Sequence, residues 1–317
     1  MRQVNQKTIN LRNKLCGQKG IKILKVFDTN EHEPNKDVVL GLWKNKKVVL
    51  RVGETRPANF LSNGFAGRYI KIPKSYLINR KEKFEIEEFL RGKMIYELSA
   101  KPRSDKLYQE KILNLLIKAH WEFQKITKQI NFSKKYKKEK LEFFYQKGKK
   151  LIDNKKSATE IIQNKRYNYF WTKLYPAKWK FAADNLILAQ ENKLGLIDLA
   201  GVRKAYWGYD LGWLIWLQWF HFSNSQYKEF DKHIKYLDNF FKRVYQLAPR
   251  TEKEDPKFFE KCWLIIFERL MGSFYDVAEG ISHAKKNLNT RKREKLFINF
   301  INNILTECYR KLLIIGK

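Results

Sequence analysis

Apolar and β-branched residues gather in three short runs near the start of the chain, at 21–27, 37–43 and 47–52. Runs of this kind, separated by polar segments, are typical of β-strands. The polar segment 29–36 between the first two runs reads as a turn. The pattern predicts an antiparallel meander of three strands.

Beyond Gly92 the apolar positions recur at steps of three and four residues, which is the repeat of an amphipathic helix. Three such stripes stand out, and we expect each to be the buried face of a helix. They are Tyr108, Ile112, Leu115, Leu116, Ala119, Phe123 and Ile126; Phe230, Ile234, Leu237, Phe241 and Val244; and Phe297, Ile301, Ile304, Cys308 and Leu312. The change of period at Gly92 predicts a small β-rich part followed by a larger helical part.

Two more apolar runs, at 186–189 and 194–197, flank the polar turn 190–193. Folded as a hairpin, this segment brings Asn185 and Asp198 to the same end. An amide oxygen and a carboxylate there could hold Mg²⁺ against nucleotide phosphates, because that ion prefers hard oxygen ligands.

The spacing continues past the hairpin. Asp198 follows Asn185 by thirteen residues (198 minus 185), and Tyr209-Asp210 places another Asp twelve residues further on (210 minus 198). The chain here resembles the aminoglycoside phosphotransferase and choline kinase group, in which I-D and Y-D pairs follow the Asn of an H-G-D-x-x-x-x-N loop at these spacings. The resemblance implies ATP and Mg²⁺ as cofactors and a two-lobed, protein-kinase-like α+β fold.

In that fold a small antiparallel β lobe precedes a mostly helical large lobe. We therefore expect a basic N-terminal extension at 1–20, a β-rich nucleotide lobe at 21–92 and a helical large lobe at 93–317. The large lobe would carry the catalytic loop and the metal-site hairpin at 178–210.

The resemblance fails at the position of the catalytic base. Five residues before Asn185, where the family has its catalytic Asp, this chain has Lys180, preceded by Lys178 and Trp179. An ammonium group cannot accept the proton of an acceptor hydroxyl unless its pKa is lowered greatly. Asp184 is a weak substitute, because it directly precedes Asn185 and would need the loop to shift.

Other residues are assigned to the nucleotide by the same resemblance. The third strand carries Arg51 where the family has the Lys that holds the phosphates, and Arg presents a planar fork in place of a compact charge. The segment 84–92 looks like the last small-lobe strand and its hinge, so the backbone of Glu88, Phe89 and Leu90 would face an adenine. An edge strand followed by a glycine turn is the alternative.

Two features of the small lobe depart from the family. The turn 29–36 is acidic and has no glycine, although backbone approach to phosphate usually relies on glycine. Glu54 is the only acid between Arg51 and Pro73. The Glu partner that a helix supplies in the family is thus missing, and the interval is too short for that helix and the following strand.

Two buried roles are also implied. Asp210 would accept hydrogen bonds from the backbone of the catalytic loop, which is a structural role. His120 resembles the L-H position of the family and is expected to be packed, not catalytic.

The chain has 317 residues with 65 Lys plus Arg against 33 Asp plus Glu, a formal net charge of +32. Its Lys-rich segments, 134–140, 147–156 and 285–295, would fit an acidic surface as partner. Nucleic acid is not favoured, because no base-reading module is recognisable. The competing explanation is a composition biased toward Lys without a functional cause.

Location is predicted from three further features. Cys16, Cys262 and Cys308 lie in no C-x-x-C pattern, which argues against structural zinc and a disulfide framework. No apolar segment follows Met1, and the uncharged run 211–227 is too short and too polar for a membrane span. We expect a cytoplasmic protein without a transmembrane span, or one at the membrane surface.

These expectations combine into a kinase-like protein that binds ATP and Mg²⁺, with transfer of the γ-phosphate to a small-molecule or sugar hydroxyl impaired or lost because Lys180 replaces the catalytic Asp. One alternative is an active small-molecule, envelope sugar or lipid kinase, an ATP-dependent phosphotransferase acting on an alcohol group without the usual base. A second alternative is a pseudokinase scaffold with a basic, polyanion-binding surface.

Overall fold

The computed structural model describes residues 4–27, 34–58, 60–95, 106–178, 181, 185–189, 192–221, 229–281, 284 and 288–315. The chain divides into two compact units. The first comprises Met1–Gln109 with Ala183–Val202, and the second comprises Glu110–Ala182 with Arg203–Lys317.

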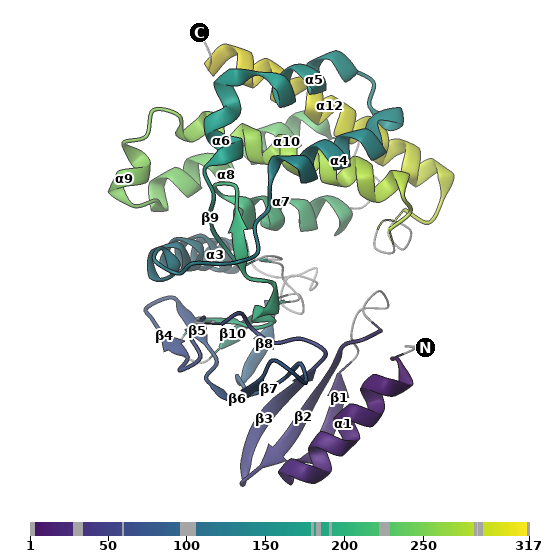
Figure 1. The fold of residues 1–317 in the computed structure, drawn as a ribbon. Coiled ribbons are helices and arrows are strands. Elements are labelled where there is room, and N and C mark those ends of the chain that lie inside the picture. The colour runs from purple at the N-terminus through teal and green to yellow at the C-terminus, as the bar shows by residue number, and fades with distance from the viewer. Residues whose placement is uncertain are drawn as a thin grey trace. The chain divides into compact units, whose positions relative to one another are not determined.

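The first unit contains a five-stranded antiparallel sheet in the order β1-β2-β3-β7-β6 (Figure 1). Its strands are β1 (Lys22–Phe27), β2 (Asp37–Trp43), β3 (Lys46–Val52), β7 (Phe84–Glu88) and β6 (Ser75–Asn79). The first three pair in sequence, β1 with β2 and β2 with β3, both antiparallel. The predicted meander is therefore confirmed, with strand ends within one residue of the expected ones.

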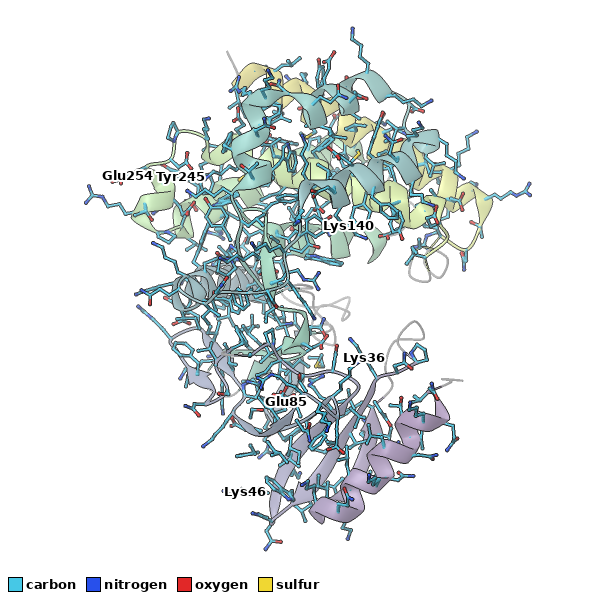
Figure 2. All side chains as sticks on the ribbon, in the orientation of Figure 1. Lys36, Lys46, Glu85, Lys140, Tyr245 and Glu254 are labelled. Carbon is cyan, nitrogen blue, oxygen red and sulfur yellow. The ribbon has the colours of Figure 1, made fainter. Side chains whose placement is uncertain are left out.

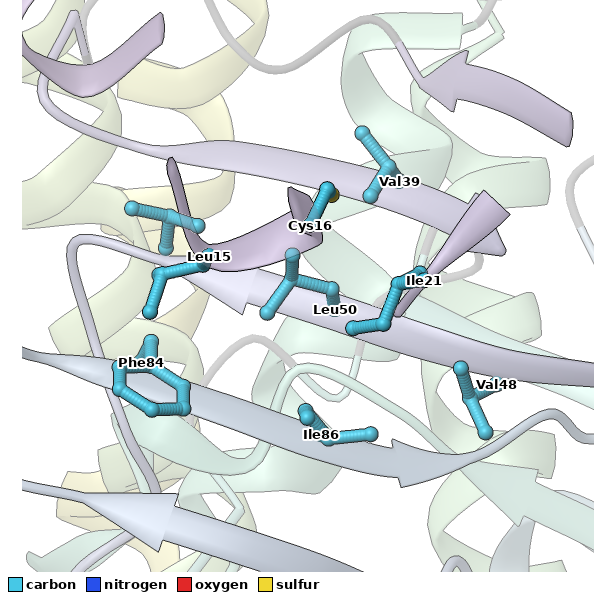
Figure 3. Close-up of a cluster of buried hydrophobic side chains, with 9 residues drawn as sticks. Leu15, Cys16, Ile21, Val39, Val48, Leu50, Phe84 and Ile86 are labelled. Carbon is cyan, nitrogen blue, oxygen red and sulfur yellow. The ribbon is translucent and has the colours of Figure 1, made fainter. Parts of the chain in front are cut away.

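Helix α1 (Gln6–Lys19) covers one face of this sheet. It begins at Asn5, whose side chain accepts a hydrogen bond from Lys7 N at 2.9 Å, and ends at Gly20, whose φ of 66° is the left-handed conformation that glycine favours. Leu15 and Cys16 of the helix pack on strand residues such as Leu50 (Figure 3). The segment expected as a basic extension is thus part of the core of the unit.

A second sheet in the first unit is completed by the later segment of the chain. Its order is β4-β5-β11-β10-β8, and its strands are β4 (Phe65–Ala66), β5 (Ile70–Ile72), β11 (Leu194–Leu196), β10 (Leu186–Ala189) and β8 (Gly92–Met94). Strand β11 pairs parallel to β5, and β10 pairs antiparallel to β8. Because of these pairings, the 183–202 segment is grouped with the N-terminal strands, whereas the predicted ranges assign it to the large lobe.

The second unit is mainly helical. Its helices begin with α3 (Lys106–Thr127, which crosses the boundary of the units) and continue with α4 (Lys138–Gly148), α5 (Lys155–Gln163), α6 (Asn168–Thr172), α7 (Tyr209–His221), α8 (Phe230–Leu247), α9 (Arg250–Lys253), α10 (Phe258–Ala278) and α12 (Arg291–Ile315); the short strands β9 (Tyr175–Ala177) and β12 (Arg203–Ala205) pair with each other. Helix α10 is buried over most of its length and contacts α4, α7, α8 and α12 (Figure 1). Among the described helices, none is long and apolar enough to cross a membrane.

The predicted apolar stripes are buried faces in this unit. Leu116, Ala119 and Phe123 of α3 are buried, and so are Leu237 and Val244 of α8. All five residues predicted for the last stripe, in α12, are buried as well. The helical periodicity of the sequence therefore identified buried faces of α3, α8 and α12, whereas the deeply buried helix α10 is not among the predicted stripes.

His120 of α3 is part of that core, as expected for a packed side chain. Its ring lies 4.8 Å from the ring of Trp121 and 6.3 Å from that of Phe181, measured between centroids. Within the described residues neither ring nitrogen has a hydrogen-bond partner. Burial lowers the pKa of His120 to about 3, so the imidazole is neutral at physiological pH.

This burial predicts a pH dependence of stability. The unfolded chain binds a proton at His120 near pH 6.5, whereas the folded chain does not until about pH 3, so stability must fall as the pH drops through that window. The slope from one group reaches about 1.4 kcal/mol per pH unit. We expect His120→Leu to flatten the fall in the free energy of unfolding between pH 6.5 and 4, measured with urea. Parallel curves for wild type and variant would contradict the assignment.

Gly92 positions the hairpin that carries Asn185 and Asp198. It pairs with Ala189, and a Cβ at Gly92 would overlap the carbonyl oxygen of Leu188 and the side chain of Ile187. We expect Gly92→Ala to lower the free energy of unfolding by about 1–3 kcal/mol, because backbone must move to admit the methyl group.

Gly17→Ala in α1 is the matched control for that measurement. A Cβ at Gly17 meets no atom within 4 Å, so the substitution should stabilise the helix by up to about 1 kcal/mol. Equal effects of the two substitutions would show that the close approach at Gly92 is unimportant.

Candidate functional site

Asn185 and Asp198 lie at the same end of the β10–β11 hairpin. Leu186 pairs with Leu196, and the N–H of Ile197 donates to the carbonyl oxygen of Asn185 at 3.3 Å. The predicted hairpin is confirmed, and it brings together the two residues that the sequence selected as metal ligands.

The backbone at Asp198 is in the left-handed region, with φ 55° and ψ 62°. Asp is among the few residues that adopt this conformation readily, and such positions are concentrated at functional sites. The side chain of Asp198 does not cap the short 3₁₀ turn that follows it, Leu199–Gly201. The Asp198 side chain is 28% exposed, which leaves room for a ligand to approach it.

Arg51 of β3 connects Asp198 to a buried carboxylate. Its Nε–H donates to Glu87 Oε1 at 2.7 Å, and its Nη1 lies 3.9 Å from Asp198 Oδ1. Burial acts to lower the pKa of Arg51, but the carboxylates of Glu87 and Asp198 outweigh it and raise that pKa. Arg51 is therefore a permanent cation beside the proposed metal ligand.

A second arginine, Arg56, extends this charge network. Its Nε pairs with Glu85 and its Nη2 with Glu87 Oε2 at 2.9 Å. Its Nη1 donates to the carbonyl oxygens of Pro73 at 2.9 Å and Leu61 at 3.2 Å. Arg56 is 1% exposed, so the segment between β3 and β4 is attached to the sheet through a fully buried cation.

Sequence reasoning missed both Glu87 and Arg56. The resemblance places an acidic partner of Arg51 between 51 and 73, where Glu54 is the only acid in the sequence, whereas the partner, Glu87, lies on β7. The available signal was the alternation Phe84-Glu-Ile-Glu-Glu88, which puts Glu85 and Glu87 on the same face of a strand. Two carboxylates on one buried face require cations, and the register of β3 with β7 supplies Arg51.

Glu54 has a different environment. It forms an ion pair with Lys36, the residue that precedes β2, and it lies beside the carboxylate of Asp198. Burial and the neighbouring Asp198 raise the pKa of Glu54, although Lys36 acts in the opposite direction. The two adjacent carboxylates of Glu54 and Asp198 thus lie between two cations, with Lys36 beside Glu54 and Arg51 beside Asp198.

The donor set fits Mg²⁺. That ion is usually held by one or two carboxylates together with substrate phosphates and waters, and dedicated all-protein cages are uncommon. Asp198 and the neighbouring Glu54 supply carboxylates of this kind, and Asn185, a residue with an amide oxygen in its side chain, lies at the same end of the hairpin as Asp198. Within the described residues no group of three or more His, Cys, Asp or Glu side chains is placed to hold a metal ion.

Strand β7 ends at Glu88, and Phe89 and Leu90 are the first residues after it. The N–H of Glu88 donates to Lys74 O at 2.8 Å, so it is already used within the sheet. In the described part of the chain, Phe89 and Leu90 lie after the end of β7 and their backbones make no backbone–backbone hydrogen bond. The assignment of these residues to an adenine stays a prediction.

Asp210 has the expected structural role in the second unit. It is fully buried and accepts a hydrogen bond from the backbone N–H of Lys178 at 2.8 Å. The interpretation of Asp210 as a support for the loop backbone is therefore confirmed. Lys180 and Asp184, the candidates at the base position, lie outside the described residues.

Some of the lysines in the basic clusters are engaged within the second unit. Lys140, which Figure 2 labels, lies over the rings of Phe143 and Phe144, with Nζ 4.9 and 4.8 Å from their centroids. Lys147 Nζ is 3.6 Å from Glu279 Oε1. Binding of the Lys-rich segments to an acidic partner surface, inferred from the net charge of +32, stays a prediction.

Comparisons with known proteins agree with this architecture. No protein-family model matches the chain, and no curated protein matches it. Among solved structures, a putative aminoglycoside phosphotransferase from Ralstonia eutropha has a TM-score of 0.55 at 12% identity, covering 96% of this chain and 98% of the other. The ADP-bound aminoglycoside phosphotransferase APH(2'')-Ib has a TM-score of 0.53 at 16% identity, with 96% and 98% coverage.

A third structure, the aminoglycoside phosphotransferase APH(4)-Ia, has a TM-score of 0.53 at 10% identity and covers 95% of this chain and 99% of its own. At such identities the likeness concerns the fold. The chain therefore has the two-lobed, kinase-like α+β fold of the aminoglycoside phosphotransferases, as the family resemblance at Asn185, Asp198 and Asp210 implies.

Proposed function

We propose that this chain is a kinase-like protein that binds ATP together with Mg²⁺, and that its transfer of phosphate to a hydroxyl acceptor is impaired or lost. The observation that carries the proposal is the convergence of Arg51 on Asp198, with 3.9 Å between Nη1 and Oδ1, at the end of the hairpin that also bears Asn185. Solved structures of the same fold include the ADP-bound APH(2'')-Ib and a streptomycin–ATP–APH(2'')-IIa ternary complex.

Each of these residues has a distinct task in nucleotide binding. Asn185 and Asp198 would hold Mg²⁺, which when bound neutralises phosphate charge. Arg51 would bind phosphate oxygens through its guanidinium, a group suited to forked contacts with such oxygens. The backbone of Phe89 and Leu90 would face the adenine.

The charges around Asp198 make this binding dependent on the metal. Lys36 and Arg51 are balanced by Glu54 and Asp198, so the ligand-free site offers no net positive charge to a triphosphate. A divalent cation adds the missing charge. Nucleotide and Mg²⁺ should therefore bind as a pair.

The chemistry is limited by Lys180. A carboxylate at this position would accept the proton of the attacking hydroxyl, a contribution of about 10²- to 10⁴-fold, and an ammonium group cannot. Asp184 is a weak substitute, because the loop would have to shift before its carboxylate could come within hydrogen-bond distance of the hydroxyl. Residual transfer would rest on positioning and charge alone, which phosphoryl transfer tolerates better than most reactions.

The acceptor would be a hydroxyl-bearing small molecule, sugar or lipid. The net charge of +32 favours an anionic one, or an approach to an acidic surface such as the cytoplasmic face of a membrane. Among solved structures with this fold, APH(2'')-IIa is seen in complex with the aminoglycoside gentamicin.

Binding is tested by ligand-dependent stability. At 100 times the dissociation constant, Mg²⁺–ATP should raise the free energy of unfolding of the wild type by about 2.7 kcal/mol. ATP without Mg²⁺ should have a much smaller effect, and Asp198→Asn should abolish most of the Mg²⁺-dependent part. The measurement is thermal or chemical unfolding with each ligand combination.

Asp231→Asn, a loss of the same charge at an exposed position in α8, is the control and should respond as the wild type does. If Mg²⁺–ATP stabilises neither wild type nor variant, nucleotide binding is ruled out. If it stabilises Asp198→Asn as much as wild type, Asp198 does not hold the metal.

Chemistry is tested by restoring the carboxylate. Lys180→Asp should raise ATP hydrolysis or transfer to an acceptor by about 10²-fold or more, because the position regains a group that accepts a proton. Rates are measured from the release of labelled phosphate.

Lys180→Gln is the matched control, because it removes the positive charge without supplying a base. A rise in Lys180→Asp alone assigns the gain to proton transfer. Equal rises in both variants would assign it to the lost cation, and no rise in either would mean that more than the base is missing.

A further inference from the structure

One face of the first sheet carries a group of buried charges. Side chains alternate along a strand, so Arg51 of β3 points to the face opposite the α1 core, which is built on Leu50 and its neighbours. In the register of β3 with β7, Arg51 lies opposite Glu85 and Val49 lies opposite Glu87. Figure 2 marks Glu85 on β7 in this sheet.

The two carboxylates share the two arginines unequally. Glu87 bonds both, with Oε1 accepting from Arg51 Nε at 2.7 Å and Oε2 from Arg56 Nη2 at 2.9 Å. Glu85 bonds Arg56 through both of its oxygens and also accepts from Ser75 Oγ at 2.7 Å. The direct carboxylate contact that fixes Arg51 within this group is that of Glu87.

We propose that Glu87 is the positioning residue for Arg51, and that from the neighbouring strand it performs the task expected of a helix-borne carboxylate between 51 and 73. This inference rests on the proposed function, because the task is to aim the guanidinium at the nucleotide phosphates. Glu87 itself acts through Arg51 and does not touch the nucleotide.

The geometry explains why an arginine stands at position 51. Glu87 takes the Nε–H, at the base of the guanidinium, while Nη1 is directed toward Asp198. A planar fork can bond a carboxylate with one edge and present its other N–H groups elsewhere, and a lysine ammonium, with its charge on one atom, cannot divide its contacts in this way. Holding Nε also reduces the rotamer freedom that phosphate binding would otherwise cost.

Arg56 neutralises charge that Arg51 alone would leave unbalanced when Glu85 and Glu87 are buried. Buried carboxylates without cations are strongly unfavourable, and Arg51 alone would leave Glu85 and Glu87 with an excess negative charge. Arg56 balances that charge and also bonds the carbonyl oxygens of Leu61 and Pro73. The segment 53–64, in which the described residues form no helix, is thereby attached to the sheet that it faces.

The test compares two carboxylates on the same strand face. Glu87→Gln removes the charge that fixes Arg51, and Glu85→Gln removes an equally buried charge from Arg56 alone. Both should lower stability. Only Glu87→Gln should weaken Mg²⁺–ATP binding, by roughly 10- to 100-fold, which is the range for a lost hydrogen bond to a charged group. Glu85→Gln should stay within about twofold of wild type.

Equal weakening in both variants, or none in Glu87→Gln, overturns the proposal. If Glu87→Gln does not fold, Glu87→Asp keeps the charge and shortens the reach by one methylene. It should fold and bind Mg²⁺–ATP less tightly than wild type, and wild-type affinity in Glu87→Asp would count against positioning by Glu87.

A second readout needs no nucleotide and separates this inference from the proposed function. The Nε–H of Arg51, identified by the NMR signal that Arg51→Lys removes, should exchange slowly with water in wild type and in Glu85→Gln. In Glu87→Gln that signal should be lost to fast exchange. Failure of Mg²⁺–ATP to bind wild type would reject the proposed function, whereas an unchanged Arg51 signal in Glu87→Gln would reject the positioning role.

Discussion

The buried contact between Arg51 and Glu87 constrains much of the first unit. A guanidinium and a carboxylate on adjacent strands, both almost without solvent, must remain together, because separating them would leave an unpaired charge in the interior. Arg56 enters the same network and holds the chain after β3 against the sheet. A buried network of this kind is weak evidence for added stability, since apolar residues could fill the space as well, and its contribution is to fix one geometry.

The hairpin of β10 and β11 belongs to the first unit, and its Asp198 lies beside Arg51 of this network. Its position depends on the close approach of Gly92 to the backbone carbonyl of Leu188, and Gly195 lies against the side chain of Leu90. Strand pairing therefore determines the positions of Asn185 and Asp198. The left-handed backbone at Asp198 ends the extended conformation of the hairpin at that residue. The residues proposed to hold the metal and the arginine proposed to bind phosphate are thus positioned by two sheets of a single unit.

Local patterns in the sequence predicted the strands and helices well, but they did not predict which charged side chains pair with each other. The meander, the helix stripes and the hairpin depend on periods of two or about three and a half residues, which any short window displays. The pairing of Arg51 with Glu87 depends on the register of strands separated by more than thirty residues, which no window contains. Helix α1 was expected only as a basic extension, because its apolar face is narrow and rests on few residues, such as Leu15 and Cys16. Lys180 could be recognised only through its spacing from Asn185.

The parallel pairing of β11 with β5 has a consequence for how the protein is made. The first unit is interrupted by Glu110–Ala182, which belong to the second unit, so its second sheet cannot close until β11, which ends at Leu196, has left the ribosome. Until then β5 and β8 present unpaired hydrogen-bonding edges to their surroundings, and such edges invite pairing with other chains. A nascent or truncated chain ending near Gln109 would therefore carry the strands of the first sheet together with unpaired edges that can pair with other chains.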